Sequence, residues 1–355
     1  MGDRDYEFID NAISDLYKTF GFTDEIPRDL THLLYQKKVE ECIKKIAEHM
    51  GLPVSIELSY VPKRYIKGNK QSFTTTSLSK TDECGRGIEE ISAQVFIPEQ
   101  LPSYGSSKLI DYPIKICVSE NCHEKPETFI TVITHELSHV LLKAVWHPQQ
   151  NNEMFVDIVP LVFGFDNIIR FGRKDYYMEY LPDGTVRRHT ITYGYLTDPL
   201  FDYALEKINE ILRSFERQKH ILIETVNNAN LKCSIIKANI NSFRDLLNDI
   251  RQYKRKRIST NDGKRLVKLF SLDYLDSYIN TVNSSELVLS ELEQYCKKAK
   301  SCNSIVSQRI QQHIERASSI SIDLDKANRL LAEDIRVLKK NLRFTYKVRQ
   351  LFVKP

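Results

Sequence analysis

A long run of apolar residues at heptad spacing constrains the second half of this chain most strongly. Between Ile208 and Ile250 the apolar positions alternate by four and three residues, with one break at Lys219. A stripe sustained for about six heptads makes an apolar seam along one helix, and another helix must cover it. The seam consists of Ile208, Leu212, Phe215, Leu222, Val226, Ala229, Cys233, Ile236, Ile240, Phe243, Leu247 and Ile250.

A second seam follows and shifts by one residue after Leu331, as a stutter does. Strand signals are absent after about Pro199, and "STNDG" at 259–263 breaks the first helix. Because one chain supplies both seams, we expect residues 199–355 to fold back on themselves as an antiparallel coiled coil or elongated bundle, rather than to form a coiled-coil oligomer. The second seam consists of Val306, Ile310, His313, Ala317, Ile320, Leu324, Ala327 and Leu331, then Ile335, Leu338 and Leu342.

Residues 1–198 have a mixed α and β pattern and are predicted to form a separate domain. Residues 1–32 are acidic and rich in turn formers, and an amphipathic helix is expected from there to the glycine stop at Gly51. The polar stretch from Lys63 to Gly87 indicates a loop, and a helix is expected to open near Pro126. Alternating or short apolar runs predict strands at 54–61, 93–98 and 112–120.

Composition indicates an ordinary globular protein. Apolar residues make up 41% and charged residues 28% of the chain, and a net charge of +4 dictates no class of partner. The longest apolar stretch, 156–165, is too short to cross a bilayer, and Met1 is not followed by an apolar leader. Seven cysteines without a CxxC pair suit reduced thiols, so we expect a cytoplasmic protein that does not contact a membrane.

Two further clusters have a structural and a functional interpretation. Cys117, Cys122 and His123 resemble part of a metal cluster, but no fourth ligand pair lies nearby, so buried or incidental cysteines are favoured. The basic run "RQYKRKR" at 251–257 suits contact with nucleic acid phosphates, but a solvated tip of the helical hairpin is favoured because its only aromatic residue is Tyr253.

The stretch "THELSH" at 134–139 carries the strongest chemical signal. His135 and His139 are four residues apart, so both imidazoles leave one face of a helix and can converge on one ion. Glu136 is placed to act on a water molecule without being a ligand. This is the H-E-x-x-H pattern of zinc peptidases, in which zinc lowers the pKa of its water and the glutamate takes the proton.

A catalytic zinc needs a third protein ligand. His147 is one candidate, but no glycine lies between it and His139 to turn the chain early. Glu153 fits better, because it lies in a second helical stretch, and Asp157 follows one turn later on the same face. Asp157 can therefore receive the N–H of a ligand imidazole.

With "HELSH" at 135–139 and "NEMFVD" at 152–157, the chain resembles the gluzincin clan of metallopeptidases. The resemblance covers about residues 34–200 and implies His135, His139 and Glu153 as zinc ligands, Glu136 as general base and Asp157 as partner of a ligand histidine. It also implies an α+β zincin-like domain in which a twisted sheet packs on the active-site helix and its edge strand aligns the substrate.

Peptide hydrolysis also needs a donor that stabilises the oxyanion. "RRHTITYGYL" at 187–196 offers His189, Tyr193 and Tyr195, and we choose Tyr193 first, the alternative being a strand or turn whose aromatic rings pack on the core.

Two functions fit these patterns. The first is a zinc endopeptidase whose helical arm recruits a protein substrate or partner. The second is a coiled-coil interaction module with a structural or autoinhibited zincin scaffold. The first is favoured because a scaffold has no need of Glu136.

Overall fold

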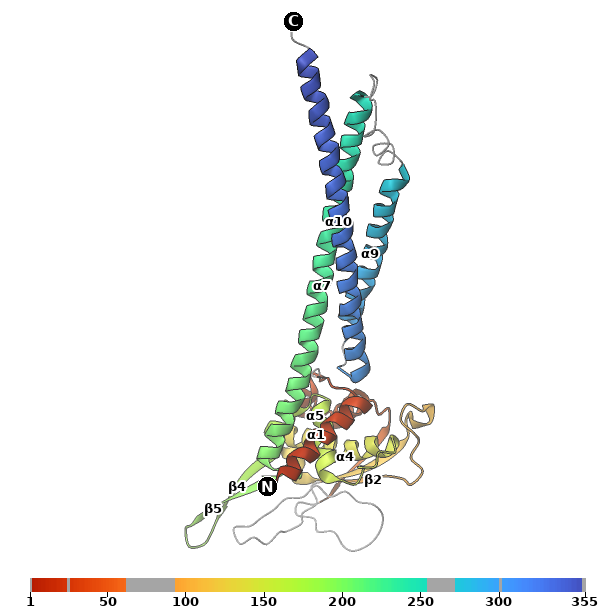
Figure 1. The fold of residues 1–355 in the computed structure, drawn as a ribbon. Helices are drawn as coiled ribbons and strands as arrows, with labels where there is room; N and C mark the ends of the chain where they lie inside the picture. The colour runs from red at the N-terminus through yellow and green to blue at the C-terminus, as the bar shows by residue number, and fades with distance from the viewer. Residues whose placement is uncertain (1, 24–25, 62–92, 254–271, 300–301, 353–355) are drawn as a thin grey trace. The chain divides into compact units, whose positions relative to one another are not determined.

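The computed structural model describes residues 2–23, 26–61, 93–253, 272–299 and 302–352, and the chain divides into two compact units (Figure 1). The first unit is Met1–Leu212 with Ser301–Ser304, and the second is Arg213–Lys300 with Ile305–Pro355. The first unit holds a small mixed sheet among helices, and the second is helical. The predicted boundary at Pro199 lies earlier in the chain than this division.

The first unit contains all the strands among the described residues. Its elements, in chain order, are α1 (Asp3–Thr19), α2 (Leu30–Tyr35), α3 (Val39–His49), β1 (Ser55–Val61), β2 (Ala93–Phe96), η1 (Ser107–Leu109), β3 (Pro113–Ser119), η2 (Glu120–Glu124), α4 (Pro126–Ala144), α5 (Glu153–Val162), α6 (Asp166–Gly172), β4 (Lys174–Tyr180), β5 (Val186–Thr192) and the first part of α7 (Asp198–Tyr253).

The three predicted strands are confirmed and form one sheet in the order β1-β3-β2. β1 runs parallel to β3, whereas β2 runs antiparallel to it, with Val95 opposite Ile116. Side chains on β3 alternate as a strand with one buried face requires, because Ile114 and Ile116 are fully buried while Lys115 is exposed. β1 and β2 are the two edges of this described sheet, and β2 packs against α4.

Helix α4 is the centre of the first unit. It opens at Pro126, where a missing N–H costs nothing, and it is buried on nearly every face. It packs against β2, α5 and α6. The contact with α6 is close because Gly172 has no side chain: a Cβ there would lie 2.2 Å from the carbonyl oxygen of Glu127 and from Oγ1 of Thr131.

The N-terminal residues differ from the prediction. Residues 3–19 form the amphipathic helix α1 rather than a series of turns, and the prediction was wrong because the acidic residues there lie on the solvent side of a buried stripe. The helix expected up to Gly51 is interrupted: Lys37 adopts a left-handed backbone (φ 61°) between α2 and α3. After α1, Phe22 pairs through its backbone with Cys302, which also belongs to the first unit. The buried stripe of α1 consists of Ile9, Ala12, Ile13 and Leu16.

Strands β4 and β5 form a two-stranded hairpin of their own. It extends away from the helices of the first unit, with its turn at the far end (Figure 1). In the chain, β4 follows directly after α6. The segment that contains Tyr193–Leu196 connects β5 to α7.

The second unit consists of the later part of α7 with α9 (Leu272–Lys298) and α10 (Ser304–Phe352). Side-chain pairs fix their directions. Lys237 binds Glu286 and the thiol of Cys296 donates to the carbonyl oxygen of Lys219, so α9 runs antiparallel to α7. Lys232 binds Asp325 and Asn239 binds Asn328, so α10 runs parallel to α7. α9 and α10 are therefore antiparallel, and the three helices pack as a bundle.

The predicted seam of α7 is buried in this bundle, and about half of the predicted seam of α10 is. In α7, every seam residue from Phe215 to Leu247 is buried; in α10, Ile310, Ala317, Leu324 and Leu331 are buried. The break "STNDG" and most of the basic run 251–257 lie outside the described residues. A third seam, on α9, was missed. It consists of Leu275, Tyr278, Val282, Leu289, Leu292 and Cys296.

Among the described residues, no helix is long and apolar enough to cross a membrane.

Candidate metal centre

Helix α4 presents the two histidines side by side. His135 and His139 are one turn apart on the same face, and their ring centroids lie 5.0 Å apart. Both are buried, with 4% and 1% of their surfaces exposed. A buried imidazole has a polar atom that needs a partner, so the pair requires a ligand or a hydrogen-bond acceptor between the rings.

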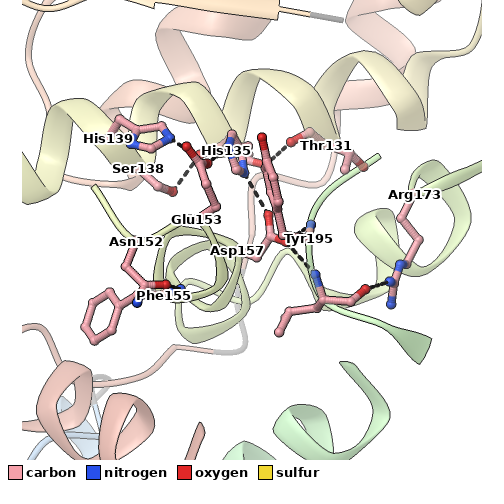
Figure 2. A network of polar contacts seen from close by, with 12 residues as sticks. Thr131, His135, Ser138, His139, Asn152, Glu153, Phe155, Asp157, Arg173 and Tyr195 are labelled. Carbon is pink, nitrogen blue, oxygen red and sulfur yellow. Dashed lines mark hydrogen bonds and ion pairs between the residues drawn. The ribbon is translucent and has the colours of Figure 1, made fainter. Parts of the chain in front are cut away.

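The third group comes from the first residue of α5. Oε2 of Glu153 lies 3.3 Å from Nε2 of His135 and 3.3 Å from Nε2 of His139 (Figure 2). The preceding residue, Asn152, caps the helix by accepting a hydrogen bond from the amide of Phe155 at 3.2 Å. The cap fixes where α5 begins, and so it places Glu153 opposite the two rings.

These three atoms fit a bound cation. Each is buried and makes no hydrogen bond, and all three lie within 4.8 Å of one another. Ligands arranged tetrahedrally at about 2.0 Å from zinc are separated by about 3.3 Å, which is the separation of both His–Glu pairs here. His135, His139 and Glu153 can therefore hold a metal ion, and they are the single such group found among the described residues.

Both histidines are oriented through their second ring nitrogen. Nδ1 of His135 lies 2.7 Å from Oδ1 of Asp157, and Nδ1 of His139 lies 3.1 Å from the carbonyl oxygen of Gln150. Because each acceptor engages Nδ1, Nε2 is the nitrogen of each ring that faces Glu153 and is placed to bind a metal. The structure thus brings Asp157 to the position predicted for it.

Asp157 is itself held by the chain that follows the hairpin. Its Oδ2 accepts hydrogen bonds from the backbone amides of Tyr195 and of Leu196, the second at 2.9 Å. The turn depends on Gly194, whose φ is 101° and whose missing Cβ would lie 2.9 Å from the same oxygen. The glycine is visible in the sequence, but no local pattern connects it with Asp157.

Arg173 supports this turn and was missed from the sequence. It is 5% exposed, its guanidinium donates to the carbonyl oxygen of Leu196, and it lies 4.2 Å from the ring centroid of Phe201. Its carbonyl oxygen also accepts from the amide of Tyr193 at 2.7 Å. An arginine at the end of a helix is common, so the sequence offers no signal that would single it out.

Glu136 follows His135 on α4 and is completely buried. Its Oε2 accepts a hydrogen bond from the amide of Val95 at 3.0 Å. Val95 is on β2, so the acid joins the metal-binding helix to the edge of the described sheet. No sequence pattern indicated this contact, because the two residues come from separate elements.

Charges in the metal-free site are strongly coupled. Burial opposes the protonated form of His135, but the contacts with Asp157 and Glu153 outweigh it and raise the pKa of His135 to about 10. Burial likewise opposes ionisation of Glu153, yet its contacts with His135 and His139 lower the pKa of this carboxyl to about 2. The site therefore carries an anionic carboxylate against a protonated imidazole, and a cation can take the place of that proton.

The remaining candidates occupy different places. His147 lies against Phe155, with its Nε2 3.0 Å from Oδ2 of Asp15, and so it faces away from Glu153. Tyr193 is buried, whereas Tyr195 lies over His135 with ring centroids 6.1 Å apart (Figure 2). The side chain of His189 lies outside the described part of the chain, and Tyr193 as the oxyanion donor stays a prediction.

The cysteine cluster is not supported by the described residues. Sγ of Cys117 lies 2.8 Å from Oγ of Ser59 on the neighbouring strand, and Cys122 is buried. The side chain of His123 is not described.

Comparison of the chain with models of protein families, with curated proteins and with solved structures found no match.

Proposed function

We propose that the first unit is a zinc-dependent peptidase of the zincin-like, gluzincin type. The observation that carries the proposal is the convergence of His135, His139 and Glu153 at 3.3 Å separations, directly beside the buried acid Glu136. A buried carboxylate that follows a ligand histidine without being a ligand is the arrangement that a general base beside a metal requires.

In this proposal the ligands and the acid divide the chemistry. Zinc held by His135, His139 and Glu153 would act as a Lewis acid on the scissile carbonyl and lower the pKa of a water molecule. The carboxylate of Glu136 accepts a proton from that water as it attacks, and it delivers the proton to the amine that leaves when the C–N bond breaks. Asp157 keeps the Nδ1 proton of His135 in place throughout.

The proposed substrate is a polypeptide in extended form. The amide of Val95 points from β2 toward Glu136, so the outer edge of this strand faces the catalytic acid. An extended peptide that pairs with this edge would present its backbone to Glu136. We further propose that the helical bundle binds a protein substrate or partner. Its long helices offer an extended surface, and the group of possible metal ligands among the described residues lies in the first unit.

Metal content and hydrolysis test the proposal together. Wild-type protein should contain about one zinc per chain by elemental analysis, and His139→Ala should contain almost none. Glu136→Gln should keep its zinc and lose at least about a hundredfold in hydrolysis in a proteome-wide cleavage screen. Glu127→Gln, in the first turn of the same helix, is the matched control and should behave as wild type. Equal cleavage by Glu136→Gln and wild type would refute the mechanism, and full zinc in His139→Ala would refute the site.

A further inference from the structure

The hairpin β4–β5 exposes large apolar side chains on one face. Met178, Tyr180 and Val186 are 53%, 78% and 53% exposed, and Tyr176, on the same face, is 49% exposed. The register explains why they gather: Tyr176, Met178 and Tyr180 alternate along β4, and Tyr180 lies opposite Val186. Single exposed apolar residues are ordinary, but several on one face of a ribbon mark a binding surface.

The base of the hairpin is fixed to the metal centre. At the start of β4, Nζ of Lys125 donates to the carbonyl oxygen of Lys174 at 3.2 Å, and Lys174 binds Asp198. At the end of β5, the chain continues into the turn whose amides hold Asp157. The exposed face therefore has a defined position relative to His135, because β4 is tied to the start of the helix that carries His135 and the chain after β5 is tied to Asp157.

The backbone of the hairpin can accept a further strand. Among the described residues, β4 and β5 pair only with each other, so each strand has an outer edge. A two-stranded ribbon is marginally stable by itself, and addition of an extended peptide to such an edge satisfies its backbone groups. Each strand has seven residues, which corresponds to roughly 20 Å of extended peptide.

Charge favours a polypeptide over a polyanion on this surface. The hairpin and its turn have three basic residues, Lys174, Arg187 and Arg188, against three acidic ones, Asp175, Glu179 and Asp183. Residues 1–212 have 23 Lys and Arg against 32 Asp and Glu, a net charge of −9, which repels nucleic acids and anionic membranes. A neutral aromatic ribbon on an acidic unit suits an uncharged, apolar segment.

We infer that the face formed by Tyr176, Met178, Tyr180 and Val186 is a docking surface for an extended polypeptide segment with apolar side chains at alternate positions. The inference rests on the proposed function, because the docked segment is the substrate, or the part of it that flanks the cleaved bond. Substrates long enough to reach from the metal centre along the hairpin gain affinity from this contact, and short peptides do not.

Binding to a random 16-residue peptide library tests the inference without any hydrolysis. Full-length Glu136→Gln protein, loaded with zinc, should enrich peptides with apolar residues at alternate positions. The same protein with Met178→Ser and Tyr180→Ser should bind the enriched peptides about tenfold more weakly or worse. A control with Tyr35→Ser and Ile110→Ser removes two other exposed apolar residues and should bind them as before. All three proteins should have equal zinc content, which checks that the first unit is folded.

Equal binding by the hairpin variant and its control, or enrichment of no peptides at all, would overturn the inference. In otherwise wild-type protein, Met178→Ser with Tyr180→Ser should raise KM for an enriched 16-residue peptide and leave kcat unchanged. Rates for four-residue fragments of that peptide should not change. Peptide binding through the hairpin without any hydrolysis would support the docking surface and refute the peptidase. Equal hydrolysis of the 16-residue peptide by wild type and the hairpin variant would support the peptidase and refute the docking surface.

Discussion

Oδ1 of Asp157 lies 2.7 Å from Nδ1 of His135, while the other oxygen of the same carboxylate accepts two backbone hydrogen bonds from Tyr195 and Leu196. One side chain thus connects a metal-binding helix to the turn after the hairpin. His135 has its ring fixed by this contact, so the orientation of its Nε2 depends on residues that never touch the metal.

Replacing Asp157 by asparagine should weaken zinc binding about ten- to a hundredfold, because the imidazole loses an anionic acceptor while the side chain keeps its shape. Competition with a chelator of known affinity measures the change. Asp323→Asn, on an exposed position of α10, is the control and should leave zinc affinity unaltered. A wild-type affinity in Asp157→Asn would mean that this contact does not support the metal.

Gly194→Ala should both destabilise the first unit and weaken zinc binding. The new Cβ would lie 2.9 Å from Asp157, and the backbone is left-handed, so we expect a loss of about 1–3 kcal/mol in the free energy of unfolding. Gly184→Ala is a matched control, since its φ is 83° but no atom lies within 4 Å of the added Cβ. Denaturant unfolding of both variants separates backbone strain from the clash, and equal zinc affinities in the two would contradict the role of this turn.

Zinc binding should release protons at neutral pH. His135 has a pKa of about 10 in the metal-free protein, so near pH 8 its proton must leave when a metal binds. Zinc affinity should therefore rise with pH until about pH 10. Calorimetry in two buffers of different ionisation enthalpy counts the protons, and release of none would show that His135 is neutral before the metal arrives.

The same pKa shifts set the pH dependence of stability without metal. The pKa of His135 is raised above its usual 6.5, so its stabilisation is complete below that pH and is lost as the pH rises through about 10. The pKa of Glu153 is lowered, so its stabilisation is present above about pH 4.5 and is lost as the pH falls toward 2. Zinc-free protein should thus lose stability between pH 7 and 10, and His135→Gln should show a smaller loss.

A chain shortened to residues 1–212 should bind zinc, whereas one that ends at Thr197 should be much less stable. The first part of α7 belongs to the first unit, and the ring of Phe201 lies against Arg173, which supports the turn at Asp157. Loss of buried leucine and phenylalanine side chains costs several kcal/mol. Thermal unfolding and zinc content of the two shortened chains give the comparison; equal melting temperatures would show that the first unit ends before α7.

Periodicity explains why much of this fold is predictable from sequence. The pair His135 and His139 is fixed by helix geometry alone, and the strands around Ile56, Val95 and Ile116 follow from short apolar runs. Both long seams are visible because heptad spacing is strict. The stripe Ile9–Leu16 and the seam on α9 were equally visible in principle; acidic residues hid the first, and Ser285 interrupts the second.

The second layer of the site could not be predicted in this way. Contacts of Glu136 with Val95, and of Arg173 with Leu196, join residues whose separation in the chain is set by loops and not by a repeat. Tyr193 and Tyr195 differ by two positions in one turn, and only the backbone conformation at Gly194 decides which ring lies over His135. Local sequence patterns indicate which residue types can take part in the site. Which residues contact one another depends on the three-dimensional path of the chain.

The backbone pairing of Phe22 with Cys302 has a consequence for the order of events on the ribosome. The two residues are 280 positions apart in the chain, so the first unit can complete this pairing only after α7 and α9 have been synthesised. A nascent chain elongates at about 5–20 residues per second, which leaves the first unit without this pairing for many seconds. During that interval the segment around Phe22 is a site where chaperones can bind, and a chain that ends before residue 302 would have a first unit that lacks this pairing.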